Sequence, residues 1–195
     1  MKTIPEDGGR PVAWDPCRPI HLVVNNADAP PGAEQLIREA VESVHSVTGL
    51  HFVIEGATTE TPMGGRGPVA TSRHGDRWSP ALLAWTEPAV VHDLQGDVAG
   101  FAGPVSAPYL TASQQHWVSG TVNLDGPQFR ALLQTLDGWS AARAIIMHEP
   151  GHLVGLTHVP VKDQLMYQSN VGQRAFGLSD REGLRQLGLG PCFTS

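Results

Sequence analysis

The sequence lacks both long hydrophobic runs and clusters of positive charge. No apolar stretch approaches the roughly 18 residues that a membrane-spanning helix requires. The 13 lysines and arginines are scattered, they are outnumbered by 19 aspartates and glutamates, and the formal net charge is −6. Proteins that bind nucleic acids or anionic membranes need a basic surface. These absences argue against nucleic acid and membrane as partners.

Cysteine is scarce, because only Cys17 and Cys192 are present, near opposite ends of the chain. The termini of a domain often lie close together, so we expect a disulfide between them, which would imply an oxidising compartment and secretion. Two free thiols in a cytosolic protein are the alternative, since pairing cannot be deduced from sequence alone. The N-terminal residues contain no apolar stretch fit for a secretory signal, so either the protein stays inside the cell or the sequence begins after the signal.

The composition is that of a folded protein with many turns. The chain has 195 residues, 41% of them hydrophobic and 16% charged, with 22 glycines and 16 prolines. This length favours one domain. We expect an N-terminal tail over residues 1–16, a single domain over residues 17–195, and a monomer.

Patterns of apolar residues predict an α/β fold. Five β-rich segments are bounded by turn-forming residues: 20–25, 51–55, 81–86, 98–101 and 117–124. Between the first two, apolar residues recur at helical spacing from Ala33 to Val47, which predicts a parallel strand pair with a right-handed crossover. Residues 56–80 show no periodicity and are expected to form a long loop.

Two further helices are expected in the C-terminal half. Ser140 can cap a helix that starts at Ala141. Ser179-Asp-Arg-Glu182 has the spacing of a capping box before Leu184 and Leu187. With the helix over 33–47, these make three principal helices.

Residues 147–158, MHEPGHLVGLTH, have the spacing of a metal site. His148 and His152 are four residues apart, so on a helix their rings leave the same face and can bind one ion. Glu149 lies beside them, where a carboxylate can take a proton from a metal-bound water. Gly155 can end the helix in the left-handed conformation and let the chain deliver His158 as a third imidazole. Three histidines leave the fourth zinc position open to water.

This segment resembles the metzincin zinc proteases, and among them the matrixins. Their signature HExxHxxGxxH is matched by His148, Glu149, His152, Gly155 and His158, and their Met-turn by Leu165-Met166-Tyr167. FGLSDREGLRQLG, over 176–188, is similar to the matrixin C-terminal helix. The resemblance is specific over residues 141–190, covers 17–140 only in topology, and is closest to a bacterial-type minimal catalytic domain.

The resemblance implies a twisted mixed sheet of five strands over a zinc cleft, between a larger subdomain (17–158) and a small C-terminal one (159–195). It implies one catalytic zinc ion, Met166 as the floor beneath it, and Glu149 as general base. It also implies an edge strand that pairs with the substrate, which we place at Ala99, Gly100, Phe101 and Ala102. No additional, structural zinc or calcium ion is expected. His74 and Asp76 resemble a fragment of such a site, and the histidines at 21, 45, 51, 92 and 116 are interpreted as surface or core residues.

The leading hypothesis is therefore a zinc endopeptidase that cleaves extended peptide segments. Pro150 motivates an alternative, a zinc-binding but catalytically weak module, because proline inside a helix removes a hydrogen bond and crowds the preceding turn. We expect a kinked but intact helix there. A third reading, an intracellular metal hydrolase of small substrates, depends only on the missing signal.

Overall fold

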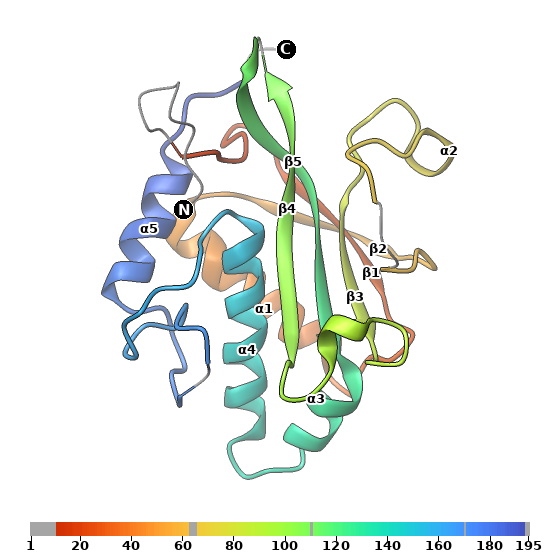
Figure 1. Ribbon diagram of the computed structural model, residues 1–195, viewed down its shortest axis with the longest axis vertical. Coiled ribbons are helices and arrows are strands. Elements are labelled where there is room, and N and C mark those ends of the chain that lie inside the picture. Colours follow the sequence, from red (N-terminus) through yellow and green to blue (C-terminus); the bar gives the residue numbers. More distant parts are fainter. Residues whose placement is uncertain (1–10, 63–65, 110, 170, 194–195) are drawn as a thin grey trace.

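A five-stranded mixed sheet forms the centre of the protein (Figure 1). The computed structural model describes residues 11–62, 66–109, 111–169 and 171–193. The strands are β1 (Ile20–Asn25), β2 (Phe52–Ala57), β3 (Ala81–Thr86), β4 (Gly100–Tyr109) and β5 (Thr111–Asp125), in the order β2-β1-β3-β5-β4. Only β4 runs antiparallel to its neighbour, β5. The predicted α/β class and five-stranded mixed sheet are confirmed.

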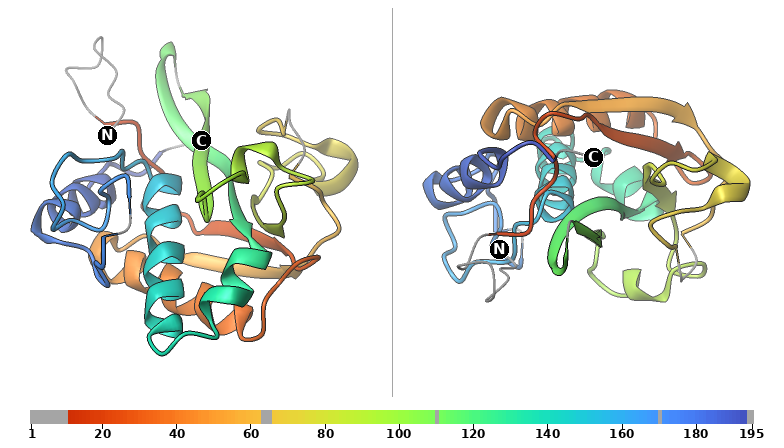
Figure 2. Two further views of the ribbon diagram at one scale, coloured as in Figure 1. Left: turned by 60° about the horizontal axis from the view of Figure 1, so that its bottom comes forward. Right: turned by 90° about the horizontal axis from the view of Figure 1, so that it is seen from above.

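Three of the helices in the described residues are long: α1 (Ala33–Thr48), α4 (Gly138–Leu153) and α5 (Leu178–Gly188). The others are α2 (Thr71–His74), α3 (Gly126–Leu132) and the 3-10 turn η2 (His92–Leu94). Helix α1 packs against both α4 and α5, and α4 also contacts β4 and β5 (Figures 1 and 2). No helix in the described part of the chain is both long and apolar enough to cross a membrane.

The main core lies between one face of the sheet and the helices. Leu83 and Trp85 of β3 belong to this core, whereas Leu82 and Ala84 belong to a second, smaller cluster. This division follows from the alternation of side chains along a strand. Helix α1 contributes a buried stripe with helical spacing: Leu36, Ile37, Ala40, Val41 and Val44. The position of α1, and through it that of α4, is thus fixed by apolar packing.

The predicted element boundaries are confirmed for some strands and wrong for others. β1 and β3 have the predicted bounds, whereas β4 and β5 extend well beyond 98–101 and 117–124. The missed part contains Pro104 and Pro108, which sequence rules exclude from central strands but which an edge strand accepts. The predicted loop over 56–80 contains the end of β2 and the short helix α2.

Both predicted helix caps were wrong. Helix α4 begins at Gly138, three residues before Ala141, and its N-cap is Asp137 rather than Ser140. The Asp137 carboxylate pairs with Arg174 instead of capping the helix. Helix α5 begins at Leu178, so Ser179 lies inside its first turn. The N–H groups of Ser179 and Asp180 donate to Gln164 Oε1, a tertiary contact 15 and 16 residues away in sequence.

The segment before β1 is part of the core. Val12, Ala13 and Trp14 are buried, and the Trp14 Nε1–H donates to the carbonyl of Leu153 at the end of α4 (2.8 Å). The packed part of the chain therefore begins before residue 17, the expected domain boundary. Residues 1–10 of the expected tail lie outside the described residues.

Cys17 and Cys192 form a disulfide that closes a sequence separation of 175 residues. The predicted pairing is confirmed. The bridge joins the segment just after Trp14 to the end of the described chain. It therefore holds together two segments that border the C-terminal end of α4 and helix α5.

Replacing both cysteines with serine should lower the free energy of unfolding by about 2–5 kcal/mol, because the unfolded chain regains the entropy that the long loop had lost. Urea unfolding at neutral pH measures this loss. Wild-type protein reduced with a thiol is the control and should unfold at the same midpoint as the double variant. If the double variant and the reduced wild type both unfold at the midpoint of the oxidised wild type, the bridge does not stabilise the fold.

Candidate metal centre

Helix α4 positions two of the three candidate ligands. It contains His148, Glu149 and His152, and it runs without a break through Pro150 to Leu153. The proline carbonyl still accepts a hydrogen bond from the Val154 N–H (3.0 Å). Since proline has no N–H, the helical bond to the Ile146 carbonyl is missing. The helix is intact, as predicted, while the kink stays a prediction, and the two histidines lie one turn apart on one face.

Gly155 ends the helix and turns the chain toward the third histidine. Its φ of 115° lies in the region that favours glycine, and an added Cβ would lie 2.9 Å from Trp117 Nε1. The Gly155 N–H donates to the His152 carbonyl and the Leu156 N–H to the Gly151 carbonyl (both 2.9 Å). These two bonds form a Schellman motif. The turn predicted at Gly155 is thus present, and it brings His158 back beside the helix.

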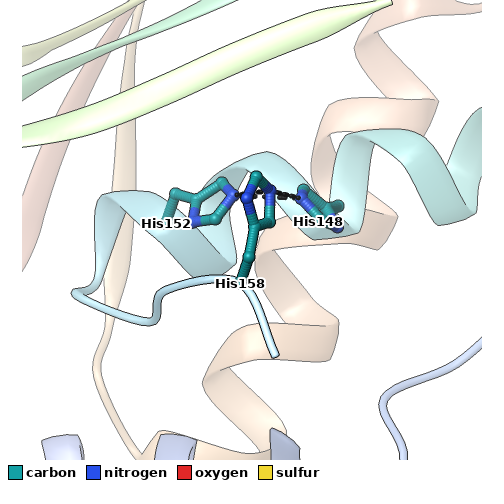
Figure 3. A group of neighbouring side chains, drawn as sticks. All are labelled: His148, His152 and His158. Carbon is teal, nitrogen blue, oxygen red and sulfur yellow. Dashed lines mark hydrogen bonds between the residues drawn. The ribbon is translucent and has the colours of Figure 1, made fainter. Parts of the chain in front are cut away.

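The three histidines converge on one point (Figure 3). Their Nε2 atoms are separated by 3.0 Å between His148 and His152, and by 3.1 Å from each of these to His158. Tetrahedral zinc at 2.0–2.1 Å from each nitrogen would separate them by about 3.3–3.4 Å. A metal ion could therefore be bound with adjustments of a few tenths of an ångström.

The protonation pattern of the rings also favours a cation. His148 Nδ1 lies 2.8 Å from the Leu165 carbonyl, and His152 Nδ1 lies 2.9 Å from the Leu156 carbonyl. A carbonyl can only accept, so each Nδ1 carries the proton and each Nε2 of a neutral ring presents a lone pair. The Nε2 atoms of His148 and His152 then face each other with no hydrogen between them. Two facing lone pairs repel each other, and the repulsion is relieved either by a metal ion or by an Nε2–H of His158 that donates to one of them.

Burial keeps these rings neutral. Desolvation lowers the pKa of His148 and of His158, and lowers that of His152 to about 4. Neutral imidazole is the form that binds metal, so these histidines do not need to lose a proton near neutral pH. Among the described residues one other group has metal-ligand spacing, Asp15 with Cys17 and Cys192, but both of its sulfurs are in the disulfide.

Met166 lies beneath the histidine helix. It is fully buried, and a Cβ added to Gly151 would lie 2.8 Å from its sulfur, so Gly151 leaves the space that Met166 fills. The Met166 carbonyl accepts from the Val159 N–H (3.0 Å), directly after His158. The methionine thus packs under the site, and its backbone fixes the chain next to the third ligand.

Asp180 is a site residue that sequence reasoning did not single out. Its buried Oδ2 accepts from the N–H groups of Leu165 (2.6 Å), Met166 (3.3 Å) and Gly177 (3.1 Å). Leu165 is the residue whose carbonyl orients His148. One carboxylate on α5 therefore anchors the turn that orients a candidate ligand. The sequence signal was its place in the predicted capping box.

Glu149 is buried beside the triad and does not belong to it. Its side chain is 4% exposed, and its Oε2 has no hydrogen-bond partner within the described chain. Desolvation raises the pKa of this carboxyl to about 8. A cation beside it would favour the ionised form. The Glu149 Cγ lies against Gly100 at the start of β4, where an added Cβ would come within 3.1 Å.

Two cavities border the histidines. The larger, of about 860 Å³, extends from Glu149 and the start of β4 to Tyr167 and Val171, and its lining includes the predicted edge-strand residues Ala99 to Ala102. The smaller, of about 430 Å³, lies between His152 and His158 and the middle of β4. The structure therefore brings together the candidate ligands, Glu149 and the predicted edge strand around open space.

The other histidines do not join this group. His74 Nε2 lies 3.2 Å from Glu60 Oε2, in a network where the Glu60 carboxylate also pairs with Arg66 and Arg73. His21 pairs with Glu55 (2.8 Å), and His45 Nδ1 lies 3.1 Å from the Leu50 carbonyl. The arginine side chains occupy the positions beside the Glu60 carboxylate where a metal ion would have to bind. His74 and Asp76 are thus in no group with metal-ligand spacing within the described residues.

No protein-family model matches the chain, and no curated protein matches it.

The raised pKa of Glu149 predicts how stability depends on pH in the zinc-free protein. Between the unfolded pKa near 4.5 and the folded value near 8, the folded state binds a proton that the unfolded state does not. The carboxyl's contribution is therefore fully present below about pH 4.5 and is lost as pH rises through about 8. From about pH 5 to pH 9, zinc-free wild type should lose several kcal/mol more stability than zinc-free Glu149→Gln. Urea unfolding of both proteins at the two pH values measures these losses. An equal loss of stability in wild type and in Glu149→Gln would contradict the prediction.

Asp180→Asn should weaken metal binding without touching a ligand. Loss of the charged acceptor loosens the Leu165 turn, so we expect about 1–3 kcal/mol lower stability and about 10- to 100-fold weaker zinc binding. Competition with a chromophoric chelator measures the affinity. Glu182→Gln, which changes an exposed carboxylate on the same helix, is the matched control and should bind zinc like the wild type. Equal affinities of Asp180→Asn and wild type would show that this carboxylate does not position His148.

Proposed function

We propose that this protein is a zinc-dependent metalloendopeptidase of the metzincin type, most similar to the matrixins. The observation that carries the proposal is the convergence of three Nε2 atoms within 3.1 Å of one another, beside a buried carboxyl that is not one of the ligands. His148, His152 and His158 would hold one zinc ion. The HExxHxxGxxH spacing and the methionine packed under the helix support the same assignment.

A zinc ion held by His148, His152 and His158 would supply a Lewis acid and would lower the pKa of a water molecule in the site. Glu149 takes the proton of the attacking water and passes it to the nitrogen of the leaving amine. Its position supports this role, because the buried carboxyl lies beside the triad without being one of the candidate ligands and is therefore available to exchange a proton. His148 and His152 keep their orientation through the carbonyls of Leu165 and Leu156.

The substrate would be an extended protein or peptide segment. The open edge of β4 and the two cavities beside the triad support this class, because an extended peptide can add to a free strand edge. In this proposal the cleft separates residues 17–158 from a small subdomain over 159–195. The disulfide favours an extracellular location over the cytosol, and a monomer is sufficient for the chemistry.

The alternative is a zinc-binding module with weak or no turnover. Pro150 motivates it, since the bond to the Ile146 carbonyl is lost within one turn of the proposed base. The continuous helix and the buried position of Glu149 favour the enzyme. The two functions differ in one respect that can be measured: the module binds zinc and peptide without hydrolysis.

Glu149→Gln should abolish hydrolysis of casein and leave the zinc content near one equivalent, because the carboxylate acts as base and not as ligand. Elemental analysis and a phenanthroline-sensitive protease assay measure the two quantities. His158→Ala is the matched control and should lose zinc and activity together. Loss of zinc in Glu149→Gln would contradict the assigned role. If the wild type binds zinc tightly but does not hydrolyse casein, the zinc-binding module is favoured instead.

A further inference from the structure

The open edge of β4 beside the triad limits how a peptide can pair with it. β4 is the last strand of the sheet, and within the described chain only β5 pairs with it. It also contacts α4, the helix that carries His148 and His152 (Figure 1). Ala102, Pro104 and Ser106 line the smaller cavity together with His152 and His158. A peptide that reached the triad along this edge would therefore meet these three residues in turn.

The pairing with β5 shows which backbone groups face the open edge. The Ala99 carbonyl accepts from the Asp125 N–H (2.9 Å), so the backbone of Ala99 faces β5. Backbone groups alternate along an antiparallel strand, so those of Phe101 and Gly103 also face β5. Those of Gly100, Ala102 and Pro104, which lie within the regular register from Gly100 to Val105, then face outward, toward the cavities.

Proline at position 104 removes one donor from this outward row. Gly100 and Ala102 offer an N–H and a carbonyl each, whereas Pro104 offers only a carbonyl. An antiparallel peptide would exchange two hydrogen bonds with Ala102 but only one with Pro104. Because β4 runs from Gly100 to Pro104, the N-terminal part of an antiparallel peptide lies opposite Pro104. Gly100 lies against Glu149 and lines the larger cavity together with the three histidines, whereas Pro104 does not line it, so we place the cleaved bond at the Gly100 end of the edge.

Building on the proposed function, we propose that Pro104 sets the N-terminal limit of the fully paired substrate segment. The substrate residues that exchange two hydrogen bonds with β4 run from the residue opposite Gly100, near the cleaved bond, to the residue opposite Ala102. The residue opposite Pro104, two positions further toward the peptide N-terminus, forms one hydrogen bond in place of two. The preferred substrate is a peptide with a short paired segment on the N-terminal side, and longer extensions contribute little.

The test measures peptide binding in the absence of turnover. Zinc-loaded Glu149→Gln, with and without Pro104→Ala, is titrated with fluorescein-labelled peptides of the form (Ala)n-Gly-Leu-Ala-Ala-amide, with n running from one to six. Short peptides should bind equally to both proteins. Once the peptide includes the residue opposite position 104, the alanine variant should bind about 2- to 10-fold more tightly, through one restored hydrogen bond. C-terminal extensions should produce no such step.

Two control variants separate this effect from general changes in the strand. Gly103→Ala changes a residue whose backbone faces β5 and whose added Cβ meets no atom within 4 Å. Pro108→Ala restores a donor outside both cavities. Neither should produce the length-dependent step, and Pro104→Ser, which also restores the N–H, should reproduce it.

The inference is overturned if Pro104→Ala changes affinity equally at every length, if the step follows C-terminal extension, or if no peptide binds. It is tested separately from catalysis. Suppose that the affinity gained by Pro104→Ala depends on peptide length as expected, but the wild-type protein hydrolyses none of these peptides. The inference about the β4 edge would then be upheld, and the proposed enzyme would be refuted.

Discussion

Three imidazole nitrogens lie about 3 Å apart, those of His148 and His152 with facing lone pairs, and the surrounding structure must hold them there. A bound cation would offset the repulsion between these two lone pairs, so the arrangement is compatible with metal binding. Two backbone carbonyls, of Leu165 and Leu156, prevent the rings on α4 from turning away. Much of the C-terminal half of the chain can be understood as support for these two carbonyls.

The support comes from segments that are far apart in sequence. The Leu156 carbonyl is placed by the Schellman turn at Gly155, which is covered by Trp117 of β5 and Leu187 of α5. The Leu165 carbonyl is placed by the carboxylate of Asp180. The N-terminal segment reaches the same region, because Trp14 bonds to the end of α4. The disulfide then joins this segment to the residues after α5.

The sequence predicts the candidate ligands better than it predicts the tertiary contacts that hold them in place. His148, His152, Gly155 and His158 depend on helical spacing and one glycine turn, and both are local properties. The buried strands β1 and β3 were equally clear, because continuous apolar runs mark them. Asp180 was not identified as a site residue, since its role depends on contacts 14 and 15 residues away in the chain. β4 was underestimated because Pro104 and Pro108 are compatible with a strand only at an open edge, which the sequence does not reveal.

The central claim is that one metal ion occupies the point where the three Nε2 atoms converge. Crystals of the protein grown with zinc, with diffraction recorded on both sides of the zinc absorption edge, test it most directly. We predict one anomalous peak, about 2.0–2.1 Å from each Nε2 of His148, His152 and His158 and not bonded to Glu149. A peak bonded to Glu149, a peak elsewhere alone, or no peak with the three rings turned apart would contradict it.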